Sequence, residues 1–582
     1  MKVLKVFLGI ILGIIILVIP ISQFQTSPLD SLQTLTVQLD GRKKPLDTLA
    51  RETVAKIHGK SQYTTNDGEK LNYLDTYLSL WLNNRDWNQE KFILFNYRPL
   101  KEKIGLNLEQ KYFSFAEIIN SDLSKIIRQV EVKQNNNIDL NRDEKEALTI
   151  EDRIVLMMEN VGQNSLPIIP HPTDIKGKWL GIDQVQQYYE IEQINPILTE
   201  YNNLQKTYQT SPKNLEVLGN IASSLHQQLY NLSPQIYPQN SVMKKEVNFY
   251  KFHLFAKTWQ LYILAFLIIL GTVIFKPLKS DDESTESKGF YEIGLGTFMV
   301  GIFIQGYAFI DRMEIANRPP VTNMYESVIW VGFGIALFAL IFELIYRAKY
   351  YLLAALPLSI ICLILADNLP AVLDPSIKPL VPVLRDNFWL SVHVPTITLS
   401  YASFALAMGL GHIILGFYLF KPQALNQINK LFQWNYRVLQ LGVLLLTTGI
   451  ILGGIWAHFS WGRFWGWDPK ETWALIALMA YIVPLHGRLA GWLSQFGMSV
   501  ISIVSFNAVL MAWYGVNFVL GKGLHSYGFA TGGSELIVGS FVILDLIFVI
   551  IATLRYKNWS NSQLANNSSE TTIKTVEYSM KV

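Results

Sequence analysis

The sequence predicts an all-α polytopic membrane protein with about ten transmembrane helices and an N-terminal, mostly helical extracytoplasmic domain. The 582-residue chain is 50% hydrophobic and only 16% charged. Its mean hydropathy is +0.22, more apolar than is usual for a soluble protein of this length. Apolar runs long enough to span a bilayer fill the chain from about residue 259 onward, and one more begins it.

Charge and cysteine content exclude several functional classes. The net charge of +3 is too close to balance to indicate a nucleic-acid partner. Cys362 is the only cysteine, so the chain has neither a disulfide framework nor a CxxC redox pair. It also contains no CxxCH segment and is therefore not itself a c-type cytochrome.

The N-terminal part, residues 1–22, carries an apolar run from about residue 4, with Lys2 and Lys5 at its start and no small-x-small cleavage site after it. This pattern predicts an uncleaved transmembrane anchor whose N-terminus is cytoplasmic. Residues 23–257 are polar and rich in Asn, Gln, Lys and Glu, which predicts a folded domain on the outer side. Three of its histidines, His58, His171 and His226, are isolated, and no catalytic or metal-ligand pattern surrounds them.

The polytopic domain is predicted over residues 258–556, with a cytoplasmic tail at 557–582. Lysines and arginines flanking the spans number eleven on the predicted inner side and seven on the outer side, a positive-inside bias that supports the predicted topology. The nine runs of spanning length are 259–275, 290–310, 325–345, 351–366, 393–420, 438–456, 472–487, 496–515 and 535–554, and the outer segments are 312–324, 367–392, 457–471 and 516–534.

Tryptophan is concentrated in one outer loop, residues 457–473, and the residue just before it. Five of the fifteen tryptophans lie between Trp456 and Trp473, where an even spread would place fewer than one. An interfacial aromatic belt accounts for one or two of them. Glycines and a proline interleave the rest in HFSWGRFWGWDPKETW. A wide aromatic platform of this kind suits a large, flat, apolar ligand.

Acidic residues beside this platform have a structural explanation. Asp468, Pro469 and Glu471 occupy the N-cap, N1 and N3 positions of a capping box that would open the next membrane helix. Asn323 and Glu326 in TNMYES repeat the spacing. We therefore expect both acidic residues to satisfy free N–H groups at a helix start, in preference to acid–base catalysis.

Three histidines of the polytopic domain are candidate metal ligands. His393 and His525 are both predicted on the outer side, which they share with the tryptophan platform. Either alone is explained as a polar residue at the headgroup level, but together with the platform they suggest two axial ligands for one flat metallocycle. His486 lies about 21 Å along its helix from the outer end. An ionisable group at that depth suggests function, with a snorkelling side chain as the alternative.

WGRFWGWDPKETWAL resembles the tryptophan-rich WWD signature of haem-handling membrane proteins. Together with TNMYES, FWLSVHV, YIVPLHGR and GKGLHSYGF, it makes residues 290–554 resemble the CcsA family of the System II cytochrome c assembly pathway. The upstream segment VQLDGRKKPLDTLARETVAKIHGK is similar to outer-domain sequence that precedes the CcsA part of fused CcsB–CcsA synthases.

The resemblance implies a membrane protein of the cell inner (cytoplasmic) membrane that takes haem b (iron protoporphyrin IX) from the inner side. Haem would be presented outside to the CxxCH of apocytochrome c, whose thiols attack the vinyl groups, so no residue of this chain is a nucleophile. The chain would then be a subunit of a cytochrome c synthase (haem lyase). Because it lacks a CcsB-like block, a separate CcsB/ResB-type partner is implied, unless His253 or His412 supplies the further transmembrane histidine.

The resemblance also assigns site residues. His393 and His525 match the outer-side haem ligands, and His486 matches a transmembrane ligand. Outer cations would meet the haem propionates. The matching WWD-loop residues are Trp461, Trp465, Trp467, Asp468 and Trp473, and the candidate cations are Arg463 and Lys470, with Arg385 and Lys522.

Three alternatives remain open on the sequence alone. A haem transporter or chaperone that delivers haem without taking part in its attachment would carry the same binding residues. A System I relative of the CcmC or CcmF type is less compatible with the outer domain and with GLHSYGF. A channel whose tryptophan loop is a gate is disfavoured by the scarcity of charges within the spans.

Overall fold

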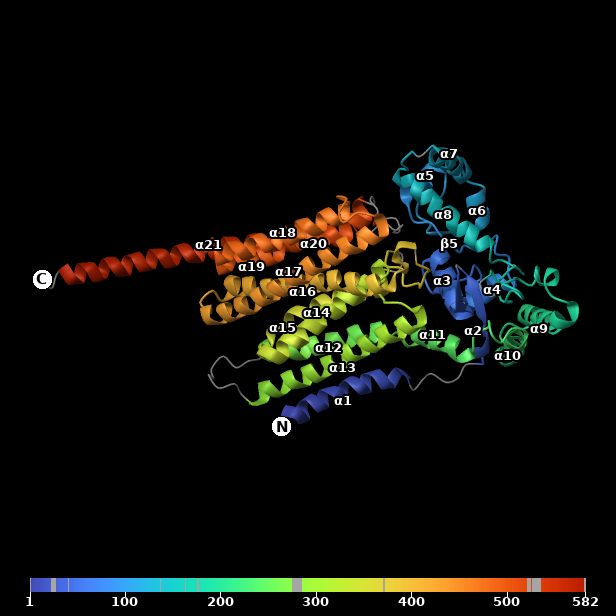
Figure 1. Cartoon of the computed structure of the whole chain (residues 1–582), viewed down its shortest axis with the longest axis horizontal. Helices are drawn as coiled ribbons and strands as arrows, with labels where there is room; N and C mark the ends of the chain where they lie inside the picture. The colour runs from blue at the N-terminus through green and yellow to red at the C-terminus, as the bar shows by residue number, and fades with distance from the viewer. Residues whose placement is uncertain are drawn as a thin grey trace. The chain divides into compact units, whose positions relative to one another are not determined.

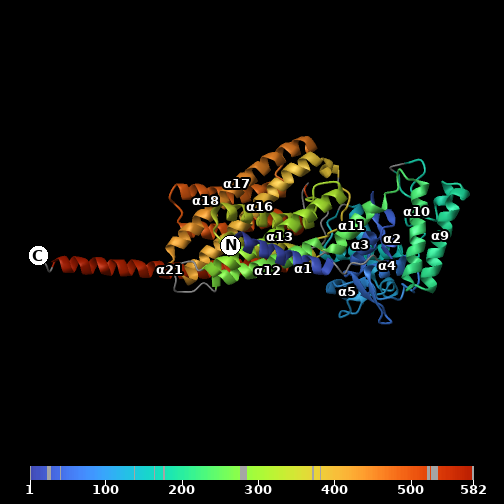
Figure 2. The same ribbon diagram turned by 90° about the horizontal axis from the view of Figure 1, so that it is seen from below.

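The chain forms two units of internally dense contact. The N-terminal unit comprises Pro20–His253 and Ser376–Pro379, and the membrane unit comprises Met1–Ile19, Leu254–Pro375 and Leu380–Val582. Figures 1 and 2 label their elements. The computed structural model describes residues 2–21, 28–39, 41–136, 138–162, 164–174, 177–274, 285–369, 372–380, 382–520, 525 and 535–579.

The N-terminal unit is mostly helical, as predicted, and its described residues include three short two-stranded antiparallel sheets. Its core is a single cluster of buried apolar side chains, including Trp81 and Trp87. The elements are α2 (Asp30–Gln33), β1 (Thr36–Leu39), β2 (Arg42–Pro45), α3 (Leu46–His58), β3 (Gln62–Thr64), β4 (Lys70–Asn72), α4 (Tyr73–Trp81), β5 (Ile93–Leu94), α5 (Arg98–Lys103), β6 (Tyr112–Phe113), α6 (Phe115–Ile119), α7 (Leu123–Asn135), α8 (Arg142–Met158), η1 (Val185–Gln187), α9 (Ile191–Thr210), α10 (Leu215–Leu232) and α11 (Asn240–Phe252).

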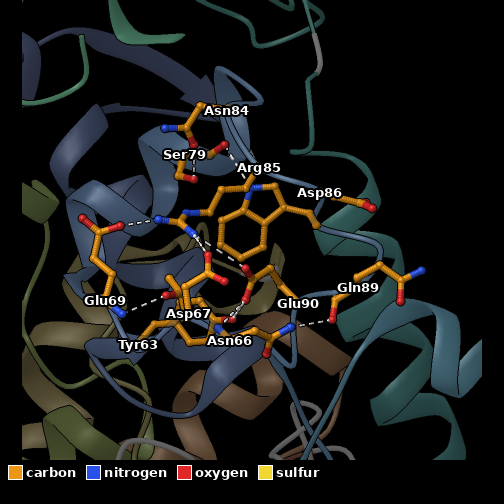
Figure 3. Close-up of polar contacts among 12 residues, drawn as sticks. Tyr63, Asn66, Asp67, Glu69, Ser79, Asn84, Arg85, Asp86, Gln89 and Glu90 are labelled. Carbon is orange, nitrogen blue, oxygen red and sulfur yellow. Dashed lines mark hydrogen bonds and ion pairs between the residues drawn. The ribbon is translucent and has the colours of Figure 1, made fainter. Parts of the chain in front are cut away.

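Charged residues of the loop between β3 and β4 pair with charged residues of the segment that follows α4 (Figure 3). The Arg85 guanidinium pairs with Asp67 at 3.3 Å, with Glu69, and with Glu90 at 3.8 Å. The Tyr63 hydroxyl donates to the buried Glu90 carboxylate. Burial, reinforced by Glu90, raises the pKa of Tyr63 well above its usual range. Each charge in this cluster is answered by another side chain of the same unit.

The membrane unit consists of long apolar helices that run alongside one another in both views (Figures 1 and 2). Nine helical segments among the described residues are long and apolar enough to cross a membrane, which confirms the polytopic all-α prediction. The helices are α1 (Lys2–Ile21), α12 (Leu254–Ile274), α13 (Thr285–Ala316), α14 (Met324–Tyr346), α15 (Tyr350–Asn368), η2 (Pro382–Arg385), α16 (Asn387–Phe420), α17 (Leu425–Trp461), α18 (Pro469–Leu489), α19 (Gln495–Val504), α20 (Phe506–Leu510), η3 (Met511–Leu520) and α21 (Glu535–Ser579).

The apolar helix α1, 20 residues long, packs on α13 through glycines. A Cβ at Gly9 would lie 2.1 Å from the Ile293 carbonyl oxygen, and one at Gly296 would lie 2.2 Å from that of Val6. Because lipid tails are as apolar as the helices, close backbone approach at small residues is the usual source of association in a bilayer. The predicted first anchor is thus held by the membrane unit.

Helix α16 is the centre of the part of the membrane unit that carries the predicted site. It packs along α17 and also contacts α14, α15, α19 and α21. The predicted span at 496–515 is not one regular helix: α19 and α20 are followed by η3, a π-helix of 10 residues. π-helical geometry is rare and is often found at functional sites.

Candidate functional site

A cavity opens in the membrane unit where the start of α14, the first turns of α16, the end of α17, the start of α18, and η3 meet. It encloses about 1280 Å³ of unfilled space, counting its open mouth. Most of its lining is apolar or aromatic. The predicted ligands His393 and His525 both line it, together with Trp456, Trp461, Trp465 and Lys470.

His393 lies in the second turn of α16 and is fixed against α17. Its Nδ1 donates to the Gly449 carbonyl oxygen at 2.9 Å. A Cβ at Gly453 would lie 2.5 Å from the imidazole Cε1, so the ring fills the space that this glycine leaves. Because a carbonyl can only accept, Nδ1 carries the proton and the lone pair is on Nε2. That nitrogen has no hydrogen-bond partner among the described residues.

His525 is held by the tryptophan loop. Its Nδ1 lies 2.8 Å from Oδ2 of Asp468, and its ring meets the indole of Trp461 edge-on at 5.0 Å. The Asp468 carboxylate is 6% exposed. An ionised carboxylate accepts only, so Nδ1 again donates and Nε2 carries the lone pair. Within the described part of the chain this Nε2 is also without a hydrogen-bond partner.

The predicted capping box at the start of α18 is confirmed. Asp468 accepts from the Lys470 N–H at 3.2 Å, and Glu471 accepts from the Asp468 N–H at 3.1 Å. Glu471 also accepts from the Gly466 N–H and from Arg463. The contact of Asp468 with His525 was not predicted, because capping alone already explained this carboxylate. Asp468 therefore joins the helix start to a candidate ligand.

The second predicted cap differs in part. Asn323 accepts from the Glu326 N–H at 2.8 Å and caps α14 as expected. The Glu326 carboxylate accepts from the Thr322 N–H and hydroxyl and pairs with Arg312 at 2.8 Å. Arg312 is fully buried, although the predicted topology begins an outer segment, 312–324, at this residue. The pair ties α13 to α14, and neither residue lines the cavity.

The predicted WWD residues divide into two groups. Trp461 and Trp465 line the cavity, and Nε1 of Trp465 is buried without a hydrogen-bond partner among the described residues. Trp467 is 69% exposed, has a left-handed backbone (φ 57°), and does not line the cavity. Trp473 also lies outside the lining. The residues brought together are therefore the early part of the loop and Trp456 before it.

The predicted cations divide similarly. Lys470 lines the cavity, and Nζ has no hydrogen bond or ion pair with any described residue. Arg463 is occupied: it pairs with Glu471 at 3.1 Å and lies over the Trp461 ring. Arg385 donates to the Leu380 carbonyl oxygen, and Lys522 lies outside the described residues. Lys470 is thus the best placed of the four to meet an anionic ligand.

Several lining residues escaped the sequence analysis, among them Trp513 and Asn517 of η3 and Tyr401 of α16. Trp513 donates to the Ser327 hydroxyl at 3.2 Å, and Asn517 donates to the Trp513 carbonyl oxygen at 2.7 Å. The first contact joins η3 to α14 at the cavity wall, since Ser327 also lines the cavity. Apolar periodicity cannot reveal this arrangement, because the π-helix changes which residues share a face.

The remaining histidines lie elsewhere. His486, in the last turn of α18, is exposed, donates through Nδ1 to the Ile482 carbonyl oxygen, and does not line the cavity. Nε2 of His412 lies 2.8 Å from Oδ1 of Asp545, joining α16 to α21; the sequence analysis had left open that His412 supplies a further transmembrane ligand. His458 stacks on Phe464. His412 is therefore engaged, whereas His486 faces outward from its unit.

The donor set fits a metallocycle better than a bare ion. Among the described residues, no three His, Cys, Asp or Glu side chains gather as a metal-ion site. Two imidazole nitrogens alone cannot hold a bare ion firmly, but a porphyrin supplies the four remaining ligands of its iron. Apolar walls, two lone pairs and one unpaired cation are what an iron porphyrin with carboxylate side chains requires.

Comparison with known proteins agrees with this chemistry. Residues 321–525 match the family described as cytochrome C assembly protein, and this range includes His393 and His525. NrfI of Wolinella succinogenes is 30% identical over 505 residues, covering 84% of this chain and 53% of that protein, so the chain spans about half the length of NrfI. The cytochrome c biogenesis protein CcsA of Prochlorococcus marinus (strain MIT 9301) is 32% identical over 280 residues, covering 42% of this chain and 88% of CcsA. CcsA of Trieres chinensis is 31% identical over the same coverage.

Proposed function

Since the chain belongs to the CcsA family of cytochrome c biogenesis proteins, we propose that it binds haem in the cavity and presents it for attachment to apocytochrome c. The observation that carries the proposal is the pair of imidazoles, His393 and His525, which line one cavity with both Nε2 lone pairs unengaged. Imidazole is a standard axial ligand of haem iron.

Haem b suits the remaining features of the cavity. Trp456, Trp461 and Trp465 offer apolar faces that would bury the macrocycle. Two donors in the wall, the Lys470 ammonium and the Trp465 indole N–H, lack partners among the described residues and would meet a propionate. Different residues of the cavity wall would therefore bind the iron, the ring and the carboxylates of iron protoporphyrin IX.

The attachment step would draw its nucleophiles from the cytochrome. Each CxxCH thiol adds across one haem vinyl group: sulfur bonds to the carbon next to the ring, and the proton ends on the terminal carbon. The electrons balance without an external oxidant. The contribution of this chain is to hold haem and exclude water, a positioning effect that can be worth several kcal/mol. The chain would act as a subunit of a cytochrome c synthase.

A membrane partner of the CcsB/ResB type fits the exposed side of the membrane unit. His486 lies exposed on α18, on the same helical stripe as Met479 and Val483, which are also exposed. Haem bound to His486 would need its second axial ligand from another chain, because His412 is engaged with Asp545. We place His486 toward the cytoplasmic side of the inner membrane, and the cavity and the N-terminal unit on the outer side.

The test is a reconstitution of the full chain with and without a CcsB-type partner, supplied with haem and a CxxCH peptide. The proposal requires a Soret band, thioether formation, and loss of cavity haem in His486→Ala because supply from the inner side is cut. Haem binding without any contribution to thioether yield would instead identify a carrier that only delivers haem. A His486→Ala protein with normal cavity haem would remove the conduit role.

A further inference from the structure

The two candidate iron ligands differ in what holds their second nitrogen. Nδ1 of His393 donates to a neutral backbone carbonyl, that of Gly449, at 2.9 Å. Nδ1 of His525 donates to a buried carboxylate, that of Asp468, at 2.8 Å. The distances match, so the difference between the two sites lies in charge.

Asp468 lies at a position that favours a negatively charged side chain. It is the N-cap of α18, where the N–H of Lys470 donates to it and the positive end of the helix dipole favours negative charge. A hydrogen bond to an ionised acceptor is roughly twice as strong as one to a neutral acceptor. A carboxylate behind a histidine also raises the basicity of the nitrogen that faces the metal.

We infer that His525, supported by Asp468, is the ligand that retains the iron, and that His393 is the ligand exchanged for the histidine of the incoming CxxCH segment. The inference rests on the proposed function, since it concerns haem bound between these two side chains. The exchange breaks the bond from iron to His393 Nε2 and forms one from iron to the incoming imidazole. Proton and electron counts do not change. Asp468 is a positioning residue in this step.

The first test separates the charge of Asp468 from its capping role. Asparagine is an equally good N-cap, so Asp468→Asn should keep the fold while removing the charge behind His525. Haem dissociation from the full chain should become about 10- to 100-fold faster, and the haem midpoint potential should rise because less electron density reaches ferric iron. The matched control is Asp386→Asn, which neutralises the N-cap of α16 without contacting a histidine. An unchanged potential in Asp468→Asn would overturn the inference.

The second test asks which ligand is exchanged. His393→Ala and His525→Ala are reconstituted to equal haem occupancy with excess haem and given the CxxCH peptide. Thioether yield per bound haem should fall in both variants, but at least about tenfold further in His525→Ala, because the ligand missing in His393→Ala is the one that the incoming histidine replaces. Equal yields, or the reverse order, would overturn the assignment. A wild-type chain that binds no haem would instead refute the proposed function, so the two failures are distinguishable.

Discussion

The charged cluster around Arg85 in the N-terminal unit and the cavity in the membrane unit both contain polar and charged side chains. In the cluster these groups are paired with one another, whereas in the cavity several are left unpaired. At Arg85 each charge meets an opposite charge of the same chain: Asp67, Glu69 and Glu90 surround the guanidinium. In the cavity, the two imidazole lone pairs and the Lys470 ammonium have no hydrogen-bond or ion-pair partner among the described residues. Polar groups paired within the chain stabilise a fold, whereas those left unpaired in an apolar cavity are available to a ligand.

Removing either cavity imidazole should have the largest effect, and that effect should be on haem content. His393→Ala and His525→Ala should each lower the haem content of the isolated protein by more than about tenfold, exceeding the loss typical of an outer-shell partner. Because so little haem would stay bound at cellular haem levels, both should abolish cytochrome c maturation in cells while the protein still inserts, and free imidazole should restore part of it. The control is His458→Ala, since His458 itself does not line the cavity, although Phe464, on which it stacks, does. Absorbance at the Soret band gives the result.

Replacing Arg85 should lower the stability of the fold without changing haem binding. Arg85→Ala leaves Glu90 buried beside Asp67 and Glu69 without its countercharge, which should cost about 3 kcal/mol of unfolding free energy. Haem content should not change. Arg98→Ala breaks a solvent-exposed pair with Glu109 and should cost less than about 1 kcal/mol. Limited proteolysis at increasing urea concentration measures the unfolding free energy of both variants. Loss of haem in Arg85→Ala would mean that the two regions do not act separately.

A third variant moves a ligand without removing it. Gly453→Ala would place a methyl group 2.5 Å from the His393 ring, so the imidazole must shift. Overpacking of this kind costs about 1–3 kcal/mol, and we expect haem affinity to fall about tenfold. Gly416→Ala is the control, because a Cβ there meets nothing within 4 Å. Equal haem titration curves for the two variants would contradict the placement of His393.

Two tryptophans of one loop give a smaller contrast. Trp465→Phe keeps an aromatic face in the cavity but removes the unpaired Nε1–H. If that group donates to a propionate, the change should weaken haem binding by about 1.5–3 kcal/mol. Trp467→Phe alters a side chain that is 69% exposed and outside the lining, so its haem affinity should match the wild type. Titration of both with haem distinguishes a donor from a purely stacking role.

The smallest expected effect is a pH dependence of the N-terminal unit. Burial lowers the pKa of His58, whose Nδ1 donates to the Phe92 carbonyl oxygen, and also lowers the pKa of His226. The unfolded chain takes up these protons near pH 6.5, and the folded unit only at lower pH. Stability should therefore be constant above about pH 6.5 and fall gradually below it. Urea titrations at pH 7.5 and 5.5 should show a smaller difference in His58→Gln.

Much of the fold could be predicted from the sequence, because long apolar runs and capping signals act locally. The helical spans and the caps at Asp468 and Asn323 are examples. Sequence reasoning also singled out His393 and His525. It could not predict that Arg312 is buried against Glu326, because that pairing depends on how α13 meets α14.

The interior of the cavity was the least predictable part. The contribution of Trp513 and Asn517 follows from the π-helical geometry of η3, which leaves no mark in the spacing of apolar residues. The contact between Asp468 and His525 spans 57 positions, and no local rule links the two residues. Likewise, the tryptophan count could not separate Trp465 in the lining from Trp467 at the surface.

The most direct test of the central claim is the visible spectrum of the purified full chain after haem supplementation, for the wild type and for His393→Ala/His525→Ala. The account predicts a six-coordinate bis-imidazole spectrum with a Soret band in the wild type. In the double variant this signature should disappear while the protein still inserts and folds. A double variant with the wild-type spectrum, or a wild-type protein with no Soret band, would contradict it.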